Sequence, residues 1–478
     1  MCGFVGMIAG ESVAAPLLLA LQTIQHRGQD AAGLGTWDDR RVHLVKGTGM
    51  INHAVPVESL PTLKGHAGIS HVRYPTAGAT STSEDAQPFR TRQPGVLLAH
   101  NGNVTNMGAL TQWLRDEGYV VLSHCDAEPI LLTFTWALTR ERQAGHTAAD
   151  VVRAVKAVHE RVKGAYSVTA VLEVDGVPTL VAFRDPHGIR PGVYGQRAAD
   201  GAWMTASESV ALDVLSFEKE GDLPVGAVLL MRPGLPAVRL DVPAGEPRHC
   251  IFERVYFARP DSRMEDGRVN RTRWRMGRQL AKEWRARGFE ADLVVAVPDT
   301  SRPAAQAMAE ELGIPTREGF IKNRYSGRTF IMPDQKTRDA ALRLKLNPIR
   351  EMFEGNRVLL VDDSIVRGST MRRIVQMLRD LQPESLHIAI FSPPVRHPCF
   401  YGIDMPTQDE LVASRHAPED VQEALTGYLG ADSVTFLSVD GLAKLSGAGF
   451  CMACFDGDYV VPVNEDERAE IIADRRGA

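Results

Sequence analysis

A cysteine at position 2 is the first residue whose type and place permit nucleophilic chemistry. Removal of Met1 would make Cys2 the N-terminal residue, with a free α-amine beside its thiol. An α-amine has a pKa of about 7.7–8.0, so near neutral pH it can act as the base for its own side chain. The apolar run Phe4–Ala9 predicts a central strand that holds the terminus rigidly. The alternative is a small buried apolar residue, a common fate of free cysteines.

Four polar segments offer groups that such a nucleophile needs. His26–Asp30 ends the first predicted helix, and Arg73 is a fixed cation suited to a substrate carboxylate. Asn101–Asn103 predicts a turn whose side-chain amide and backbone N–H can form an oxyanion hole. Asp126 suits the α-ammonium group of an amino acid. The alternatives are an ordinary hairpin turn for Asn101–Asn103 and solvated surface for the two charges.

A second chemical motif, VLLVDDSIVRGST, occupies Val358–Thr370. An apolar strand there delivers the adjacent carboxylates Asp362 and Asp363, which suit ribose hydroxyls directly or through Mg²⁺. The loop that follows ends in Gly-Ser-Thr and leads into a predicted helix at 371–381. Its hydroxyls and the helix N-terminus can bind a phosphate. The alternative is an unrelated strand–loop–helix turn with an N-cap.

Two further segments agree with a phosphorylated ligand. Pro298–Ser301 follows the apolar strand ADLVVAV, and Ile321–Ile331 is polar, basic and contains glycine. The second segment predicts a lid that orders over a substrate, although composition alone would equally describe a solvated loop. The cations that it offers to a pyrophosphate are Lys322, Arg324 and Arg328.

The remaining cysteines are better read as thiols or metal ligands than as disulfides. The N-terminus lacks a basic segment, turns polar at Glu11 and is no secretory signal, and no run reaches the ~18 apolar residues of a membrane span. We therefore expect a cytoplasmic protein, in which disulfides are rare. Four separated thiols in a reducing compartment can close an S₄ metal site, and spacing does not separate iron–sulfur from zinc. These are Cys250, Cys399, Cys451 and Cys454, of which the first two can also be plain buried thiols.

Length, composition and charge limit the classes of protein in which these motifs can occur. The chain has 478 residues, 44% hydrophobic and 24% charged, which predicts two to four ordinary globular domains. A net charge of -5 and a pI near 6.3 give no reason to expect nucleic acid or an anionic membrane as a partner.

The elements that must position the motifs differ between the two halves. The first ~230 residues show short strand patterns and two helical patterns, at 15–25 and 127–142, which predict an α+β layered domain. The next stretch, 231–249, has four prolines and two glycines and predicts a linker.

After this linker, apolar strands alternate with helices at 271–287, 303–312 and 371–381, which predicts an α/β doubly wound parallel sheet. Ligands of such sheets bind at the carboxyl ends of the strands, here the loops that begin at Pro298 and Asp362. We expect domains at 2–235 and 250–463 and an exposed charged tail at 464–478.

The first half resembles the class II, N-terminal-nucleophile (Ntn) glutamine amidotransferases. The matching segments are Met1–Gly6, His26–Gly28, His71–Arg73 and His100–Asn103. The resemblance implies an αββα Ntn-hydrolase fold in which Cys2 attacks the glutamine side-chain amide, forms a γ-glutamyl thioester and releases ammonia.

The same resemblance assigns further roles. It implies that Arg73 and Asp126 hold glutamine, and that Asn101 with Gly102 stabilises the oxyanion. Cys125 is a departure, because relatives place a small hydroxyl or another polar residue before the aspartate.

The second half resembles type I phosphoribosyltransferases, whose ligand is phosphoribosyl pyrophosphate (PRPP). The implied substrate-binding residues are Lys322, Arg324, Arg328, Asp362, Asp363, Ser364, Arg367, Gly368, Ser369 and Thr370. The implied Mg²⁺ site adds Thr300, a variant of the more usual serine, to Asp362 and Asp363.

A glutaminase followed by a PRPP site resembles the amidophosphoribosyltransferase family, from Cys2 to about Val463 and including YFARPDS at Tyr256–Ser262. The resemblance implies that PRPP, glutamine and water give 5-phosphoribosylamine, glutamate and pyrophosphate, the first committed step of purine synthesis. It also implies a homotetramer inhibited by purine nucleotides.

The four later cysteines resemble those of the iron–sulfur subgroup and imply a [4Fe–4S] cluster. The alternatives are an amidotransferase with another acceptor, such as a sugar phosphate, and a PRPP-binding regulator that does not catalyse.

Overall fold

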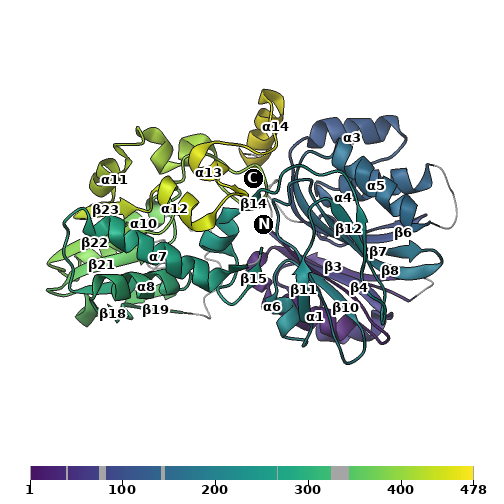
Figure 1. Cartoon of the computed structure of the whole chain (residues 1–478), viewed down its shortest axis with the longest axis horizontal. Coiled ribbons are helices and arrows are strands. Elements are labelled where there is room, and N and C mark those ends of the chain that lie inside the picture. The colour runs from purple at the N-terminus through teal and green to yellow at the C-terminus, as the bar shows by residue number, and fades with distance from the viewer. Residues whose placement is uncertain are drawn as a thin grey trace.

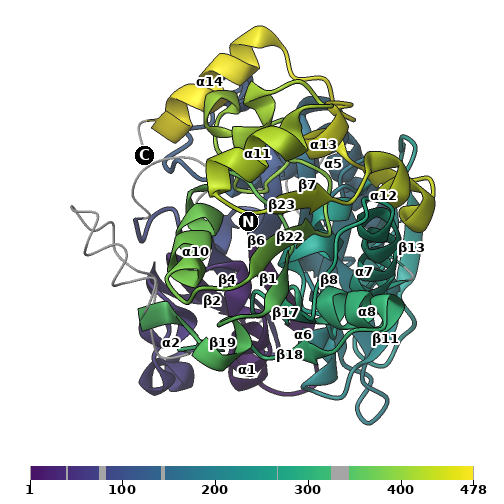
Figure 2. The ribbon, with the colours of Figure 1, turned by 90° about the vertical axis from the view of Figure 1, so that its left-hand side faces the viewer.

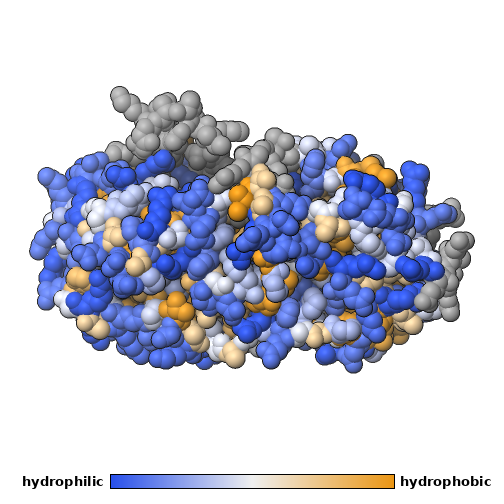
Figure 3. All heavy atoms as spheres, turned by 90° about the horizontal axis from the view of Figure 1, so that it is seen from above, coloured by the Kyte–Doolittle hydropathy of each residue, from blue (hydrophilic) through white to orange (hydrophobic). Residues whose placement is uncertain are grey.

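The structure is a computed structural model, and it describes residues 2–38, 41–74, 82–140, 146–265, 267–323 and 344–476. Figure 1 shows two lobes, the N-terminal half on the right and the C-terminal half on the left, with both chain ends near their junction. In the described ranges no helix is long and apolar enough to cross a membrane. The face in Figure 3 is mainly hydrophilic, with apolar residues in small separate groups.

The N-terminal lobe contains two antiparallel sheets. The first has the order β11-β9-β10-β1-β4-β2-β3. Its strands are β1 (Gly3–Ile8), β2 (Ala31–Trp37), β3 (Val42–Thr48), β4 (Ala67–Arg73), β9 (Val193–Gln196), β10 (Trp203–Ala206) and β11 (Glu218–Asp222). The second has the order β13-β12-β8-β7-β6-β5. Its strands are β5 (Phe89–Arg92), β6 (Gly95–Val104), β7 (Gly164–Val174), β8 (Val177–Arg184), β12 (Ala227–Met231) and β13 (Val238–Asp241).

Helices cover the outer face of each sheet. Those on the first sheet are α1 (Ala14–Thr23), α2 (Ile51–Ala54) and α6 (Val210–Asp213), and those on the second are α3 (Met107–Asp116), α4 (Ala127–Thr139) and α5 (Ala148–Arg161). Strand β1 shows why the layers form, because Phe4 and Ile8 enter the core between the sheets while Val5 and Met7 pack with α1. Successive side chains of a strand point to opposite faces. The layers are therefore αββα.

Some features of this lobe differ from the sequence expectations. Helices α3 and α5 were not predicted, although Thr147 and Asp150 form a capping box at the start of α5. The stretch predicted as a linker contains β13, so the second sheet continues beyond residue 235.

The C-terminal lobe is built on a parallel sheet with the order β18-β17-β21-β22-β23. Its strands are β17 (Leu293–Ala296), β18 (Thr316–Arg317), β21 (Arg357–Asp362), β22 (Ser385–Ile390) and β23 (Ser433–Phe436). The flanking helices are α7 (Val269–Arg285), α8 (Arg302–Leu312), α10 (Ser369–Arg379), α11 (Val421–Leu429) and α12 (Val439–Ser446). Each of the three predicted helices starts within two residues of its expected position.

Both faces of this sheet are covered, as the apolar strands predict. Val294 and Leu359 pack with α7 and α8, whereas their neighbours Val295 and Leu360 pack with α10 and α11. Figure 2 shows α10 and α7 on opposite sides of the sheet.

Short elements join the lobes. They are β14 (His249–Cys250), β24 (Phe450–Cys451), β15 (Arg263–Met264), β16 (Gly267–Arg268) and α13 (Ala453–Asp456), with a π-helical turn at Glu253–Phe257. A separate pair of strands, β19 (Phe320–Lys322) and β20 (Leu346–Pro348), packs on the core of the C-terminal lobe. The charged end of the chain forms α14 (Glu465–Arg476), which packs against α3. Glu467 is buried and pairs with Lys163 at 3.1 Å, so this part of the expected exposed tail is docked.

Candidate active site

Cys2 lies at the start of β1, which runs between β4 and β10. Only 6% of its surface is exposed, and its Sγ lies 3.7 Å from the carbonyl oxygen of Tyr74. Arg27 Nε donates to the Cys2 carbonyl oxygen at 2.9 Å. The Cys2 nitrogen, a peptide N–H while Met1 is attached, donates to Asn101 Oδ1 at 3.4 Å. Removal of Met1 would turn that nitrogen into an α-amine next to the thiol.

Asn101 and Gly102 lie within β6 and pair with β7, so the expected turn is wrong. Gly102 fits there because a Cβ would come within 2.0 Å of the Ala165 carbonyl oxygen. Asn101 is fully buried, and its Nδ2 has no hydrogen-bond partner among the described residues. An unpaired buried donor is costly unless a ligand satisfies it. Because Asn101 contacts the Cys2 backbone nitrogen, its amide is a candidate donor to an oxyanion that develops near the thiol.

A cavity of about 520 Å³ opens onto Cys2 and has the size of a small-molecule site. Its wall includes Arg73, Gly102 and Asp126, so the structure brings these predicted glutaminase residues together. Glu470 of α14 also lines it, although it lies near the other end of the chain.

Arg73 and Asp126 remain charged in this cavity. Burial lowers the pKa of Arg73, but nearby Cys125 and Cys2 outweigh it and the pKa is raised. Burial likewise raises the pKa of Asp126, yet its pKa is lowered overall, mainly by His100, whose Nε2 lies 3.2 Å from Asp126 Oδ2. The same Oδ2 accepts from the Val104 N–H at 3.0 Å. Arg73 and Asp126 thus offer a cation and an anion to a zwitterionic ligand in this cavity.

Cys125, the departure noted in the sequence, is a buried thiol in the cavity wall. Burial, with Asp126 adding to it, raises its pKa to about 12. Gln87 Nε2 donates to its sulfur at 3.6 Å. Since the thiolate is the nucleophile, Cys125 does not compete with Cys2.

The second candidate site lies at the carboxyl edge of the parallel sheet. Ser301 Oγ, after β17, donates to Asp362 Oδ1 at 3.2 Å, and Ser364 Oγ donates to Asp363 Oδ1 at 2.6 Å. Burial and the adjacent Asp363 raise the pKa of Asp362, and burial raises that of Asp363 to about 6. Two crowded carboxylates are a place that a cation or hydroxyl groups would stabilise.

The other residues predicted to bind PRPP differ in how close the structure brings them to this edge. Gly368 takes a φ of +74° at the start of α10, where Ser369 and Thr370 are exposed. Arg367 instead pairs with Glu410 at 3.0 Å on the surface. Lys322 Nζ lies 2.6 Å from Asp299 Oδ2, which places it beside the loop after β17. Thr300 is half-buried in that loop. Arg324 and Arg328 lie outside the described residues.

The four later cysteines gather where the short strands β14 and β24 pair. Cys250 and Cys451 are register partners, and the Cys454 carbonyl accepts from the His397 N–H at 3.1 Å, two residues before Cys399. Burial, followed by Cys399 and Cys250, raises the pKa of Cys454. Across the described ranges, no three His, Cys, Asp or Glu side chains stand ready to hold a metal ion.

Sequence reasoning missed the groups that hold Cys2 and Asp126 in place. The motif His100–Asn103 does not reveal a role for His100, whose backbone N–H donates to Gln87 Oε1 at 2.8 Å. The motif His26–Gly28 likewise does not reveal the carboxylate partners of Arg27, which are Glu208 and Glu253. The buried character of Arg27 was not visible, because an isolated arginine is usually solvated.

Comparison with known proteins agrees with this two-site architecture. The phosphoribosyl transferase domain family matches residues 271–397, and the glutamine amidotransferase domain family matches residues 73–214. Amidophosphoribosyltransferase of Pseudomonas aeruginosa is 43% identical over 97% of this chain and 94% of its own length. That of Methanothermobacter thermautotrophicus is 39% identical over 97% and 95%.

Two solved structures are also similar over nearly their full length. Glutamine PRPP amidotransferase from B. subtilis, complexed with ADP and GMP, has a TM-score of 0.84 at 36% identity, covering 97% of this chain and 98% of its own. A second, described as the allosteric regulatory enzyme of purine biosynthesis, has a TM-score of 0.85 at 36% identity, covering 98% and 97%. This chain therefore belongs to the amidophosphoribosyltransferase family.

Proposed function

We propose that this chain converts PRPP, glutamine and water into 5-phosphoribosylamine, glutamate and pyrophosphate, the first committed step of purine synthesis. The observation that carries the proposal is the Asn101 side chain beside Cys2, whose Nδ2 has no hydrogen-bond partner among the described residues, in one chain with the adjacent carboxylates Asp362 and Asp363 at the edge of the parallel sheet. The first site suits acyl transfer from an amide, and the second suits a ribose phosphate. Family membership supplies the connection between them.

The glutaminase half uses Cys2 as nucleophile. After removal of Met1, the α-amine takes the thiol proton and the thiolate attacks the glutamine amide carbon. The oxyanion accepts hydrogen bonds from Asn101 Nδ2 and the Gly102 N–H. The C–N bond then breaks, and the departing nitrogen takes the proton from the α-ammonium as ammonia. Water hydrolyses the thioester to give glutamate and restore the thiol.

Glutamine is held by its two charged ends in this scheme. Arg73 binds the α-carboxylate, because a guanidinium matches a carboxylate with two parallel donors. Asp126 accepts from the α-ammonium group, with Oδ2 held by His100 and Val104.

In the acceptor half, Asp362 and Asp363 bind the ribose hydroxyls of PRPP, and the N-terminus of α10 binds its 5-phosphate. For the pyrophosphate we propose Lys322, which lies beside the loop after β17, together with Arg324 and Arg328, which rest on the family resemblance alone. Mg²⁺ fits this edge, since it typically takes one or two carboxylates and substrate oxygens rather than a full protein cage. It would be held by Asp362 and Asp363 with Thr300 nearby, and when bound it neutralises charge on the leaving pyrophosphate.

Ammonia passes internally from the first site to the second. Direct contact between the two halves at β6, the strand that contains Asn101 and Gly102, supports this proposal. Asn103 Nδ2 donates to the Phe400 carbonyl oxygen at 3.0 Å, and a Cβ on Gly402 would come within 3.0 Å of the Gly102 backbone. Phe400 and Gly402 of the acceptor half therefore contact the segment of β6 that stabilises the oxyanion.

We further propose a [4Fe–4S] cluster on Cys250, Cys399, Cys451 and Cys454. Three buried thiols and the half-buried Cys250, gathered from distant segments, support it, because thiolates are the ligands of such clusters. A cluster holds its ligands further apart than a single ion does. Anaerobically purified protein is expected to contain about four irons per chain, and stoichiometric zinc without iron would contradict the cluster.

The ADP and GMP bound by the B. subtilis protein support inhibition of this chain by purine nucleotides. Family resemblance also supports a homotetramer, which light scattering of the purified protein tests. The six free cysteines agree with a cytoplasmic location.

The reaction is tested with purified protein, glutamine, PRPP and Mg²⁺. Glutamate and pyrophosphate are expected to appear in equal amounts. Glutamate without pyrophosphate would indicate another acceptor, and tight PRPP binding without either product would indicate a regulator.

A further inference from the structure

Arg27 is the cation that holds the backbone of the nucleophile. Its side chain is fully buried, and its Nε donates to the Cys2 carbonyl oxygen at 2.9 Å. The guanidinium lies over the Phe257 ring, 4.6 Å from its centroid. A cation in such a place must be paired. The position of the Cys2 backbone therefore depends on the groups that fix Arg27.

Two buried carboxylates fix it, one from each lobe. Glu208 Oε1 lies 2.5 Å from Arg27 Nη1 and follows β10 of the glutaminase lobe. Glu253 Oε1 accepts from Arg27 Nη2 at 2.6 Å, and Oε2 accepts from Nη1 at 3.1 Å. Glu253 begins the π-helical turn that follows β14. Burial lowers the pKa of Arg27, but Glu253 and then Glu208 raise it above its usual value.

The two carboxylates are not equivalent. Glu208 Oε2 is also held by the Arg259 N–H at 2.9 Å and by Ser262 Oγ at 2.6 Å, both from the motif YFARPDS. Its network would persist without Arg27. Glu253, by contrast, makes the two-pronged contact that sets the plane of the Arg27 guanidinium.

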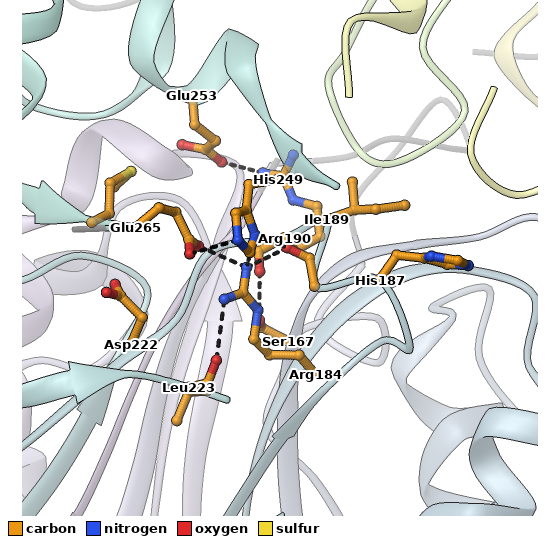
Figure 4. A network of polar contacts seen from close by, with 12 residues as sticks. Ser167, Arg184, His187, Ile189, Arg190, Asp222, Leu223, His249, Glu253 and Glu265 are labelled. Carbon is orange, nitrogen blue, oxygen red and sulfur yellow. Dashed lines mark hydrogen bonds and ion pairs between the residues drawn. The ribbon is translucent and has the colours of Figure 1, made fainter. Parts of the chain in front are cut away.

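Glu253 also binds Arg190, and Figure 4 shows the two side chains pointing toward each other. Arg190 is fully buried, and its Nε and Nη1 have no hydrogen-bond partner within the described segments. Loss of Glu253 would leave Arg190 without its acidic partner and Arg27 with only Glu208. The guanidinium of Arg27 would then reorient, and the Cys2 carbonyl would follow it.

We propose that Glu253 is a positioning residue for Cys2, acting through Arg27 from the far side of the lobe junction. It touches neither glutamine nor PRPP and sets where the nucleophile stands relative to the Asn101 amide. A displacement near 1 Å can cost about 100-fold in rate. This inference rests on the proposed function, because Cys2 must be the nucleophile.

The test compares Glu253→Gln with wild type for two nitrogen sources, glutamine and ammonium, at saturating PRPP and Mg²⁺. The glutamine-dependent kcat is expected to fall at least about 10-fold, with KM for glutamine within about 2-fold. The ammonia-dependent kcat is expected to stay within about 2-fold. Glu253→Asp, which keeps the charge but shortens the reach, is expected to show a smaller loss of the same kind.

Glu265→Gln is the matched control. Glu265 pairs with the buried Arg184 at 2.8 Å and with His249 at 3.2 Å in the region of Figure 4. It is expected to lower the unfolding temperature like Glu253→Gln but to keep the wild-type ratio of glutamine-dependent to ammonia-dependent kcat.

The inference is overturned if the Glu253 variants keep the wild-type ratio, or if Glu265→Gln changes it equally. Should Glu253→Gln fail to fold, Glu253→Asp decides by the same ratio. Failure of wild type to use either nitrogen source would instead refute the proposed function.

Discussion

Substitution of Asn101 by alanine tests the oxyanion site, because it removes the buried amide beside Cys2. Asn101 Nδ2 has no hydrogen-bond partner among the described residues, so removing this nitrogen breaks no hydrogen bond of the free protein. One oxyanion donor contributes about 2.7–4 kcal/mol, or 10²–10³ in kcat. The contact from the Cys2 nitrogen to Oδ1 is long at 3.4 Å, so its removal adds only about 0.5 kcal/mol. We expect glutamine-dependent kcat to fall about 10²–10³-fold.

The assay measures glutamate release and, separately, ammonia-dependent pyrophosphate release. KM for glutamine and ammonia-dependent kcat are expected to stay near wild type, because Asn101 stabilises only the transition state of the first reaction. Asn106→Ala is the control, since Asn106 is a buried amide bonded to the Arg161 carbonyl at 2.9 Å. Equal loss of both activities, or equal loss in both variants, would refute the oxyanion role.

Three further outcomes are expected, one for each site and one for the carboxylate Glu208 that pairs with Arg27. Alkylation at pH 8 should leave Cys125 unmodified in peptide maps, because a pKa of about 12 leaves about 10⁻⁴ of it as thiolate; rapid labelling would contradict its buried state. Asp363→Asn should lower kcat/KM for PRPP about 10–100-fold with either nitrogen source, the cost of a charged hydrogen bond, and a loss confined to glutamine would contradict this placement. Burial raises the pKa of Glu208, but His26 and Arg27 bring it below its usual 4.5, so its stabilisation is present above that pH and lost as pH falls. The gap in unfolding free energy between wild type and Glu208→Gln should therefore shrink between pH 6 and pH 3, and a constant gap would contradict the pairing.

The sequence was sufficient for features whose signal is local. The apolar run after Cys2 predicts the strand β1, and the apolar run before Asp362 predicts β21 with two carboxylates at its end. Strand–helix alternation likewise predicts the parallel sheet, because each strand is buried on both faces.

Features that depend on long-range contacts were not accessible in this way. Asn-Gly-Asn is a turn signal, but pairing of β6 along β7 keeps Asn101–Asn103 extended. The partners of Arg27 lie 181 and 226 residues away, so no local pattern reveals that it is buried. Helix α14 is highly charged, so its sequence predicts an exposed tail. Its packing against α3 and the place of Glu470 in the cavity wall depend on contacts between distant segments. Helix α5 is a different case, because its capping box, formed by Thr147 and Asp150, is a local signal that the sequence does carry.

The central claim is that Cys2 generates ammonia for a separate PRPP site. The most direct measurement compares Cys2→Ala with wild-type protein whose intact mass shows that Met1 has been removed, with each nitrogen source in turn. The variant should lose glutamine-dependent pyrophosphate release and keep ammonia-dependent release at the wild-type rate. Retention of glutamine-dependent activity, or equal loss of both activities, would contradict the division of labour between the two sites.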